Sequence, residues 1–201
     1  MTLPNQLTIL RILLTPVFIY FFLTEGAYYK EIALGVFGVA ALTDWYDGWL
    51  ARKFNYISDW GKFMDPLADK ILTAGAFFSF VALGVLPLWA VVVVVSRDVV
   101  ITLLRGYAEW RGISFKTSHY AKWKTFIQMA FLYYLLMVFV FANNAYFDRN
   151  HGPLFDALLN EDLIYYTFLV ITFITVHTGA LYFYKNWEAL KALFRSKREP
   201  L

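Results

Sequence analysis

Residues 44–70 read DWYDGWLARKFNYISDWGKFMDPLADK, and this stretch holds five of the chain's 15 acidic residues. Asp44 and Asp47 are three positions apart, and Asp65 and Asp69 are four apart, so each pair shares one face of a helix. Carboxylates that face one another repel unless cations bind between them. The spacing therefore predicts a site for hard, oxygen-preferring divalent cations.

The sequence on either side of this stretch is strongly apolar. Of 201 residues, 60% are hydrophobic and 20% aromatic, and the mean hydropathy is +0.52. Only 16% are charged, against about 25% in ordinary soluble domains. The apolar runs reach the length of about 20 residues that crosses a bilayer. The absence of cysteine excludes disulfides, thiolate metal sites and a cysteine nucleophile.

The apolar pattern predicts an all-α integral membrane protein with one domain over residues 1–201. We expect six transmembrane helices, at residues 7–23, 32–54, 63–85, 87–110, 123–141 and 163–184. Residues 1–6 are an interfacial segment, 143–162 a polar loop, and 185–201 a basic, weakly amphipathic tail. Pro66 disfavours helical geometry at Asp65, which leaves the start of the third helix open.

The distribution of positive charge predicts the orientation. Six spans place both termini on one side of the membrane, and 15 of the 18 Lys and Arg residues fall on that side. The positive-inside rule then makes the termini cytoplasmic. We therefore expect a multi-pass protein of the inner cell membrane, with the acidic stretch at the cytoplasmic face.

The acidic stretch resembles the signature of the CDP-alcohol phosphotransferase family. The matching positions are Asp44, Asp47, Gly48, Ala51, Arg52, Gly61, Asp65 and Asp69. The resemblance implies a six-helix membrane enzyme, commonly a homodimer. Such an enzyme transfers a substituted phosphate from a CDP-linked donor to an alcohol and releases CMP. It implies the lipid bilayer as the environment and no nucleic-acid partner.

The resemblance also implies roles for individual residues. Asp44, Asp47 and Asp65 would bind two divalent cations, Mg²⁺ or Mn²⁺, and Asp69 would complete this site and act as general base. The remaining matches, Gly48, Ala51, Arg52 and Gly61, would serve the nucleotide donor. Arg52 either pairs with an acid or reaches a phosphate. Plain helix capping for the acids, and small-residue packing for Gly48 and Ala51, are the competing interpretations. For Asp59 we favour capping over nucleotide contact.

Two further stretches resemble phosphatidylglycerophosphate synthases. One is Pro4-Asn5-x-x-Thr8-x-x-Arg11, which would place Asn5 and Thr8 at the donor site. An interfacial anchor with a snorkelling Arg11 is the alternative. The other comprises residues 96–98, 104–105 and 122–128, although those enzymes often have Glu where this chain has Asp98 and Gly near Ala121. The implied donor is CDP-diacylglycerol, and the implied acceptor is glycerol 3-phosphate.

Basic residues gather around the connection after residue 104, and a phosphorylated acceptor needs such cationic partners. We expect Arg105 to bind the acceptor phosphate, followed in order by Lys124 and Lys122. Plain positive-inside topology is the alternative for the loop lysines. Arg97 and Asp98 are expected to compensate each other's charge within the bundle.

Two alternative functions remain open at this point. The same reaction class could use phosphatidylglycerol, inositol phosphate or serine as acceptor. A divalent-cation transporter would also use intramembrane carboxylates. Transport favours acids near the midplane with an outward path, whereas here the acids lie toward the predicted cytoplasmic end.

Overall fold

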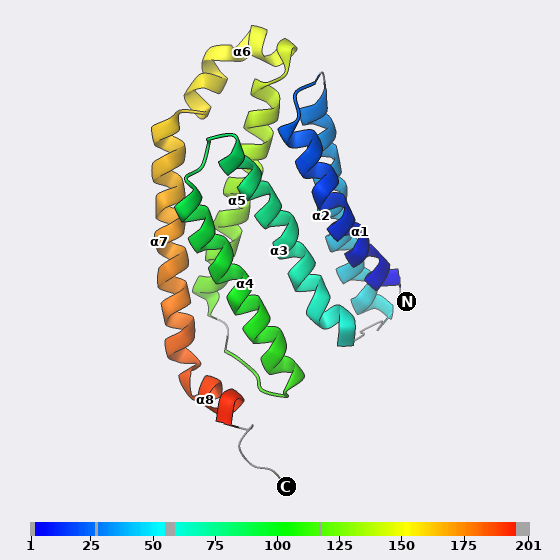
Figure 1. Ribbon diagram of the computed structural model, residues 1–201, viewed down its shortest axis with the longest axis vertical. Coiled ribbons are helices and arrows are strands. Elements are labelled where there is room, and N and C mark those ends of the chain that lie inside the picture. Colours follow the sequence, from blue (N-terminus) through cyan, green and yellow to red (C-terminus); the bar gives the residue numbers. More distant parts are fainter. Residues whose placement is uncertain (1–2, 27, 55–58, 117, 196–201) are drawn as a thin grey trace.

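A computed structural model describes residues 3–26, 28–54, 59–116 and 118–195, which form eight helices and no strand (Figure 1). They are α1 (Leu3–Leu23), α2 (Tyr29–Phe54), α3 (Asp59–Ala82), α4 (Leu88–Trp110), α5 (His119–Ala142), α6 (Ala145–Leu158), α7 (Glu161–Lys185) and α8 (Trp187–Arg195). Within these helices the side chains of residues 3–5, 44, 45, 47, 48, 50–52, 54 and 59–63 lie outside the described part. The predicted all-α class is confirmed.

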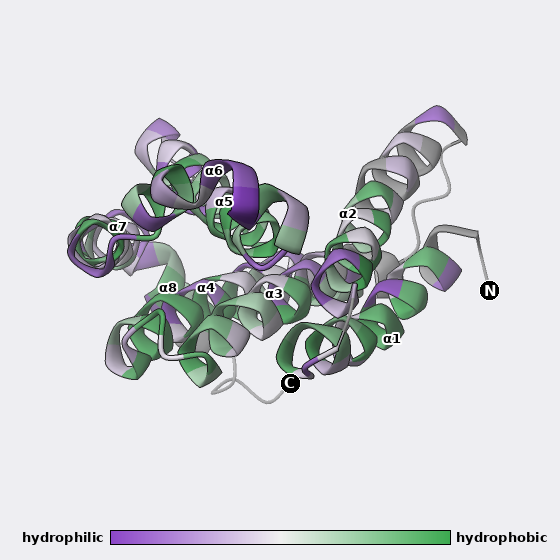
Figure 2. Ribbon diagram, turned by 90° about the horizontal axis from the view of Figure 1, so that it is seen from above, coloured by the Kyte–Doolittle hydropathy of each residue, from purple (hydrophilic) through white to green (hydrophobic). Residues whose placement is uncertain are grey.

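Each predicted span overlaps one of the helices α1–α5 and α7. Among the described residues, three helical segments are long and apolar enough to cross a membrane: Gln6–Leu23, His119–Ala142 and Glu161–Lys185. Large apolar side chains face outward on these segments, and Leu13 is 61% and Phe173 72% exposed. Figure 2 shows hydrophobic residues predominating along α1, α3, α4 and α5, and hydrophilic ones along α6. Such outward-facing apolar surface suits contact with lipid.

Aromatic side chains hold the bundle together. Phe18, Phe22, Phe77 and Phe80 are completely buried, and the rings of Phe22 and Phe80 meet edge to face with centroids 5.2 Å apart. Helix α1 packs against α2 and α3, while α4 lies between α3 and α7. The Phe22–Phe80 contact joins the ends of α1 and α3 that lie away from the acidic stretch, and the packing along both helices sets them side by side.

A glycine allows the close approach of α1 and α3. A Cβ atom on Gly75 would lie 2.9 Å from Cγ2 of Thr15 and 3.1 Å from Cδ1 of Ile19, nearer than side chains ordinarily pack. The missing side chain at this position therefore lets α3 lie directly against α1.

One local expectation was wrong, and one open boundary is now placed. The stretch predicted as a polar loop contains α6, which begins after Asn144, whose side-chain oxygen accepts a hydrogen bond from the Tyr146 amide at 3.0 Å. The helix kinks at His151, just ahead of Pro153, whose ring nitrogen has no hydrogen to donate. The start of the third helix, which the sequence left open, lies at Asp59. Pro66 is inside α3, and Asp65 is helical.

Candidate functional site

The acidic stretch spans the second half of α2 and the first half of α3, which contact each other. Asp44 and Asp47 lie on α2, and Asp65 and Asp69 on α3. The side chains of Asn5, Asp44, Asp47, Gly48, Ala51, Arg52, Asp59 and Gly61 lie outside the described residues. Their predicted roles therefore stay predictions, on helices that the fold places together.

Asp65 is held from α1. The Thr8 hydroxyl donates a hydrogen bond to Oδ1 of Asp65, and Thr8 itself is completely buried. Thr8 was predicted to serve the donor site, and the structure places it on one of the predicted metal ligands. Arg11, one turn further along α1, is also completely buried, so the alternative of a snorkelling anchor is wrong.

Asp69 lies one turn after Asp65 on α3. Its side chain is 34% exposed, and Oδ2 lies 3.5 Å from Nζ of Lys70. Two carboxylates one turn apart supply the hard oxygen ligands that Mg²⁺ and Mn²⁺ prefer. Among the described side chains there is no group of three or more potential metal ligands. Asp65 and Asp69 are the two predicted metal ligands whose side chains the structure describes, and their carboxylates are suited to binding these cations.

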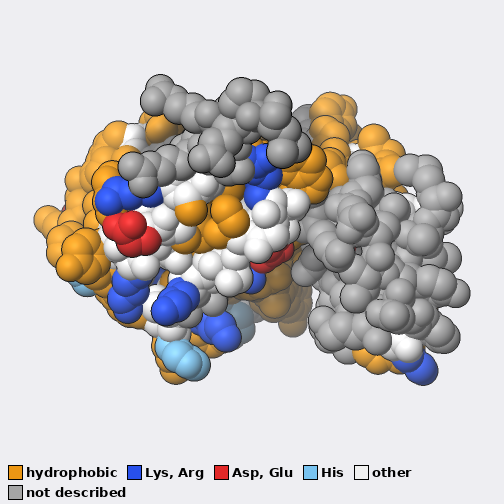
Figure 3. Space-filling view, turned by 90° about the horizontal axis from the view of Figure 1, so that it is seen from below, with side chains coloured by type: hydrophobic (Ala, Val, Ile, Leu, Met, Phe, Trp, Pro, Cys, Tyr) orange, Lys and Arg blue, Asp and Glu red, His pale blue; other side chains and the backbone are white. Residues whose placement is uncertain are grey.

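A pocket of about 350 Å³ opens among α3, α4, α5 and α7. It lies at the end of the bundle that carries α8, and Figure 3 shows Lys and Arg side chains gathered on this end. The charged groups that line it are Lys70, Arg97, Asp98, Arg105 and Glu109. Lys70 follows Asp69 directly, so α3 contributes to both the acidic pair and the pocket.

Asp98 organises the inner wall of the pocket. Its Oδ1 accepts from Nη1 of Arg97 at 2.9 Å and from Nζ of Lys124 at 2.5 Å. Asp98 is 6% exposed and Lys124 only 1%. The predicted compensation between Arg97 and Asp98 is thus confirmed. Lys124 points at Asp98 and is not among the lining residues, so any effect on an acceptor passes through that carboxylate.

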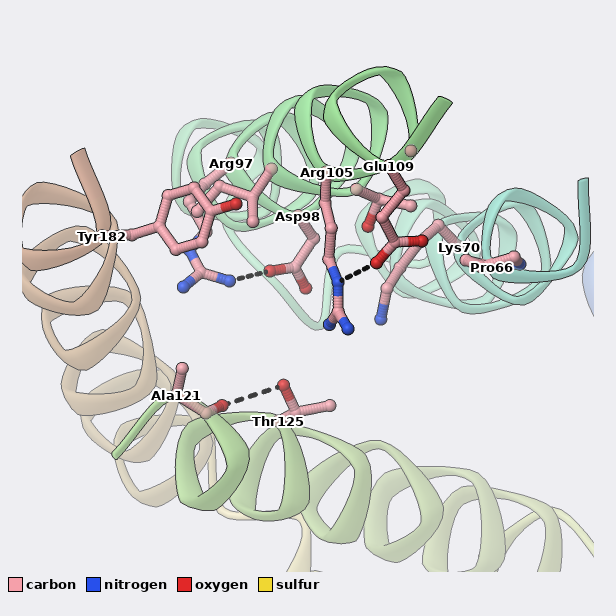
Figure 4. Close-up of a pocket in the computed structure, with 12 residues that line it drawn as sticks. Pro66, Lys70, Arg97, Asp98, Arg105, Glu109, Ala121, Thr125 and Tyr182 are labelled. Carbon is pink, nitrogen blue, oxygen red and sulfur yellow. Dashed lines mark hydrogen bonds and ion pairs between the residues drawn. The ribbon is translucent and has the colours of Figure 1, made fainter. Parts of the chain in front are cut away.

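Arg105 reaches into the mouth of the same pocket, as Figure 4 shows. Its Nε donates to Oε1 of Glu109 at 3.0 Å, and both side chains are about half exposed, at 52% and 50%. An exposed pair at this spacing contributes only about 0.3–0.5 kcal/mol. An incoming anion can therefore displace Glu109 at little cost.

Lys122 lies elsewhere. It lines a shallow hollow on α5 with His119, Trp123 and Phe126, outside the pocket that holds Arg105. The structure therefore does not bring Lys122 together with Arg105, and we leave it out of the pocket.

Sequence reasoning missed several lining residues. Lys70 was counted only toward the charge asymmetry, although its place beside Asp69 could have drawn attention to it. Tyr182 is one of many aromatic residues in the predicted spans, and nothing in the sequence distinguishes it from the others.

A membrane-type helical bundle that sets carboxylates beside a cationic pocket has the parts of an enzyme that transfers phosphate-containing groups. The sequence model of the CDP-alcohol phosphatidyltransferases matches residues 1–173, and the chain belongs to this family. It is 35% identical to the CDP-diacylglycerol–glycerol-3-phosphate 3-phosphatidyltransferase of Bacillus subtilis (strain 168), over 94% of this chain and 97% of that protein.

Two more relatives carry related names. The CDP-diacylglycerol–glycerol-3-phosphate 3-phosphatidyltransferase of Rickettsia typhi is 29% identical over 90% of this chain and 94% of its own length. A probable phosphatidylglycerophosphate synthase of Mycobacterium tuberculosis is 36% identical over 63% of this chain and 61% of its own length.

Proposed function

We propose that this enzyme transfers the phosphatidyl group of CDP-diacylglycerol to glycerol 3-phosphate, giving phosphatidylglycerophosphate and CMP. The observation that carries the proposal is the cationic pocket beside Asp65 and Asp69 on α3, because a phosphorylated acceptor needs cations next to the transfer site. The full-length similarity to the Bacillus subtilis enzyme supports the same reaction.

The donor half of the site would be built from the acidic stretch. Asp44, Asp47, Asp65 and Asp69 would hold two divalent cations, Mg²⁺ or Mn²⁺. When bound, these cations neutralise the pyrophosphate and stabilise charge on the departing CMP. Thr8 keeps the Asp65 carboxylate in place by hydrogen bonding. Asn5, Gly48, Ala51, Arg52 and Gly61 would surround the nucleotide.

The acceptor half would be the pocket. Lys70, Arg97 and Arg105 attract the phosphate of glycerol 3-phosphate, and Lys124 supports Arg97 through Asp98. Asp69 takes the proton of the acceptor hydroxyl as that oxygen attacks the phosphorus of the phosphatidyl group. The bond from this phosphorus to the bridging oxygen breaks, and CMP leaves with that oxygen.

The setting would be a six-span homodimer in the inner cell membrane, with the site at the cytoplasmic face. The three apolar helices support the membrane setting, and the charge asymmetry of the sequence supports the cytoplasmic side. Glycerol 3-phosphate would then arrive from water, and the acyl chains of the donor would stay in lipid.

An acceptor panel tests the proposal. The purified protein in detergent micelles receives CDP-diacylglycerol with Mg²⁺ or Mn²⁺, and CMP release is measured. We expect release with glycerol 3-phosphate and none with serine, inositol phosphate or phosphatidylglycerol, and loss of release when EDTA removes the metal. Release with another alcohol alone would overturn the acceptor assignment. Failure with every alcohol, combined with Mn²⁺ uptake by sealed vesicles, would favour transport.

A further inference from the structure

Tyr182, on α7, carries a buried hydroxyl that has no hydrogen-bond partner among the described residues. The residue is 7% exposed, yet it lines the pocket between α3, α4, α5 and α7. Buried polar groups in folded proteins are nearly always paired, and an unpaired one costs about 1–3 kcal/mol. A donor left in this state inside a pocket points to a ligand that supplies the missing acceptor.

The ring of Tyr182 is held in place from the side of the α4–α5 connection. Phe115 meets it edge to face, with ring centroids 5.9 Å apart. Asn186, one turn further on, donates to the Tyr182 carbonyl at 2.9 Å. The same Asn186 side chain accepts from the Lys116 amide at 2.9 Å. The hydroxyl is therefore pre-positioned, because these contacts fix the backbone and the ring together.

Helix α7 also positions the cation next to this hydroxyl. Thr178, one turn before Tyr182, accepts a hydrogen bond from Nη2 of Arg97 at 3.2 Å. A Cβ atom on Gly179 would lie 3.3 Å from Cγ of Arg97, so the glycine leaves room for the arginine stem. Figure 4 shows Tyr182 reaching from α7 to the side of the pocket where Arg97 and Asp98 lie.

The charge around the hydroxyl selects an anion. Lys70, Arg97 and Arg105 line the pocket against Asp98 and Glu109, and Lys124 is bound to Asp98 from behind. Asp69, 3.5 Å from Lys70, is a third acid beside these four cations, which leaves an excess of one positive charge. That excess favours an anion such as a phosphate, whose oxygens accept hydrogen bonds from a phenol.

We propose that Tyr182 is a specificity-determining residue, which donates its phenolic hydrogen bond to the phosphate of the acceptor. This inference rests on the proposed function, because it places glycerol 3-phosphate in the same pocket. The family match ends at residue 173, so Thr178, Gly179 and Tyr182 lie beyond the part of the chain that the match covers. A contact from this segment suits discrimination between acceptors among enzymes that share the donor chemistry.

The test is Tyr182→Phe in the full-length protein, which removes the hydroxyl and keeps the ring that packs on Phe115. We expect the KM for glycerol 3-phosphate to rise about ten-fold or more, because a hydrogen bond to a charged group is lost. The KM for CDP-diacylglycerol and kcat stay within about two-fold. The inhibition constant of inorganic phosphate, used as a competitor of glycerol 3-phosphate, should rise by the same factor as the KM of the acceptor. Tyr166→Phe, at a 63% exposed position on the same helix, is the matched control and changes neither constant.

The other outcomes separate failure of the Tyr182 inference from failure of the proposed function. If the wild-type protein releases CMP with glycerol 3-phosphate and Tyr182→Phe has the same KM, the inference fails and the proposed function stands. If the wild-type protein does not use glycerol 3-phosphate, the proposed function itself fails. A variant that does not fold shows a structural role for the hydroxyl and overturns the inference. So does a variant whose kcat, measured with both substrates saturating, falls together with its unfolding temperature.

Discussion

Asp98 has two cations on one oxygen, and this arrangement explains why a lysine can be buried at the inner wall of the pocket. Lys124 has no exposed side-chain surface and depends on Asp98 for its charge balance. Removing one partner of such a buried pair typically costs about 3–5 kcal/mol, because the other charge is left uncompensated. Asp98 therefore supports the pocket by holding Arg97 and Lys124 in place, whereas Arg105 and Lys70 pair with the more exposed acids Glu109 and Asp69.

Arg105 and Glu109 should have opposite effects on acceptor affinity. Arg105→Ala removes a phosphate partner and should raise the KM for glycerol 3-phosphate about ten-fold or more, with a small change in kcat. Glu109→Gln frees the arginine from its carboxylate and should lower the same KM. Steady-state CMP release measures both, and Lys191→Ala on α8 serves as the control. An unchanged KM in Arg105→Ala would remove Arg105 from the acceptor site.

Asp69 should be needed for turnover more than for donor binding. Asp69→Asn removes the proposed base and should lower kcat about 10²–10⁴-fold. Binding of labelled CDP-diacylglycerol should fall much less. Asp148→Asn, an exposed change on α6, is the control for the loss of one acid. Equal losses of binding and turnover would mean that Asp69 serves chiefly to hold the donor.

The pairing of α1 with α3 connects packing to the site at the scale of elements. Gly75 permits the contact, and Thr8 on α1 reaches Asp65 on α3. Helix α7 plays a comparable part on the other side, where Thr178 and Gly179 accommodate Arg97. Each half of the site thus depends on two closely packed helices. These are α1 and α3 around Asp65, and α4 and α7 around Arg97.

Gly75→Ala should therefore weaken both fold and site. The added Cβ would meet Thr15 at 2.9 Å, so the helices must separate, at a cost of about 1–3 kcal/mol. Thermal unfolding in detergent would show the loss, and activity should fall because Thr8 moves away from Asp65. Gly35→Ala is the matched control, since no described atom lies within 4 Å of a Cβ there. It should be neutral or slightly stabilising, because Ala favours helix over Gly. Equal stability of the two variants would contradict the proposed role of Gly75.

The whole molecule separates two chemically different ends. Helix α6 lies across one end, and the opposite end carries α8 and the pocket (Figure 1). On α8, Leu190 and Leu193 are buried at 7% and 1% exposure, so this part of the basic tail packs onto the bundle. The acidic stretch lies toward the same end as the pocket, so water-borne acceptor and lipid donor can meet there.

The absence of cysteine makes the proposed topology directly testable. Arg149→Cys on α6 and Lys191→Cys on α8 introduce single thiols at exposed positions of the two ends. In intact cells an impermeant maleimide should label Arg149→Cys only, whereas Lys191→Cys should react only after the membrane is opened. Labelling of both thiols in intact cells would contradict cytoplasmic termini.

The sequence by itself determined the class of the protein and its donor chemistry. An apolar run long enough to cross a bilayer predicts a helix without knowledge of its neighbours. The reason is that a helix satisfies its backbone hydrogen bonds within its own segment. The acidic stretch lies within 27 consecutive residues, and local spacing reveals its shared helix faces. Among the described helices α6 was missed, because its 14 residues are polar on average and include Gly152 and Pro153, which are typical of loops.

Only the tertiary structure decided the cationic pocket on which the proposed acceptor site rests. Its charged and polar groups come from four helices, and Arg97 and Thr178 are 81 positions apart in the chain. Lys122 and Lys124 look equivalent in sequence, yet one lies on an outer hollow and the other on Asp98. Which way a side chain points, and whether Tyr182 finds a partner, depends on how the helices pack, and local spacing carries no information about that packing.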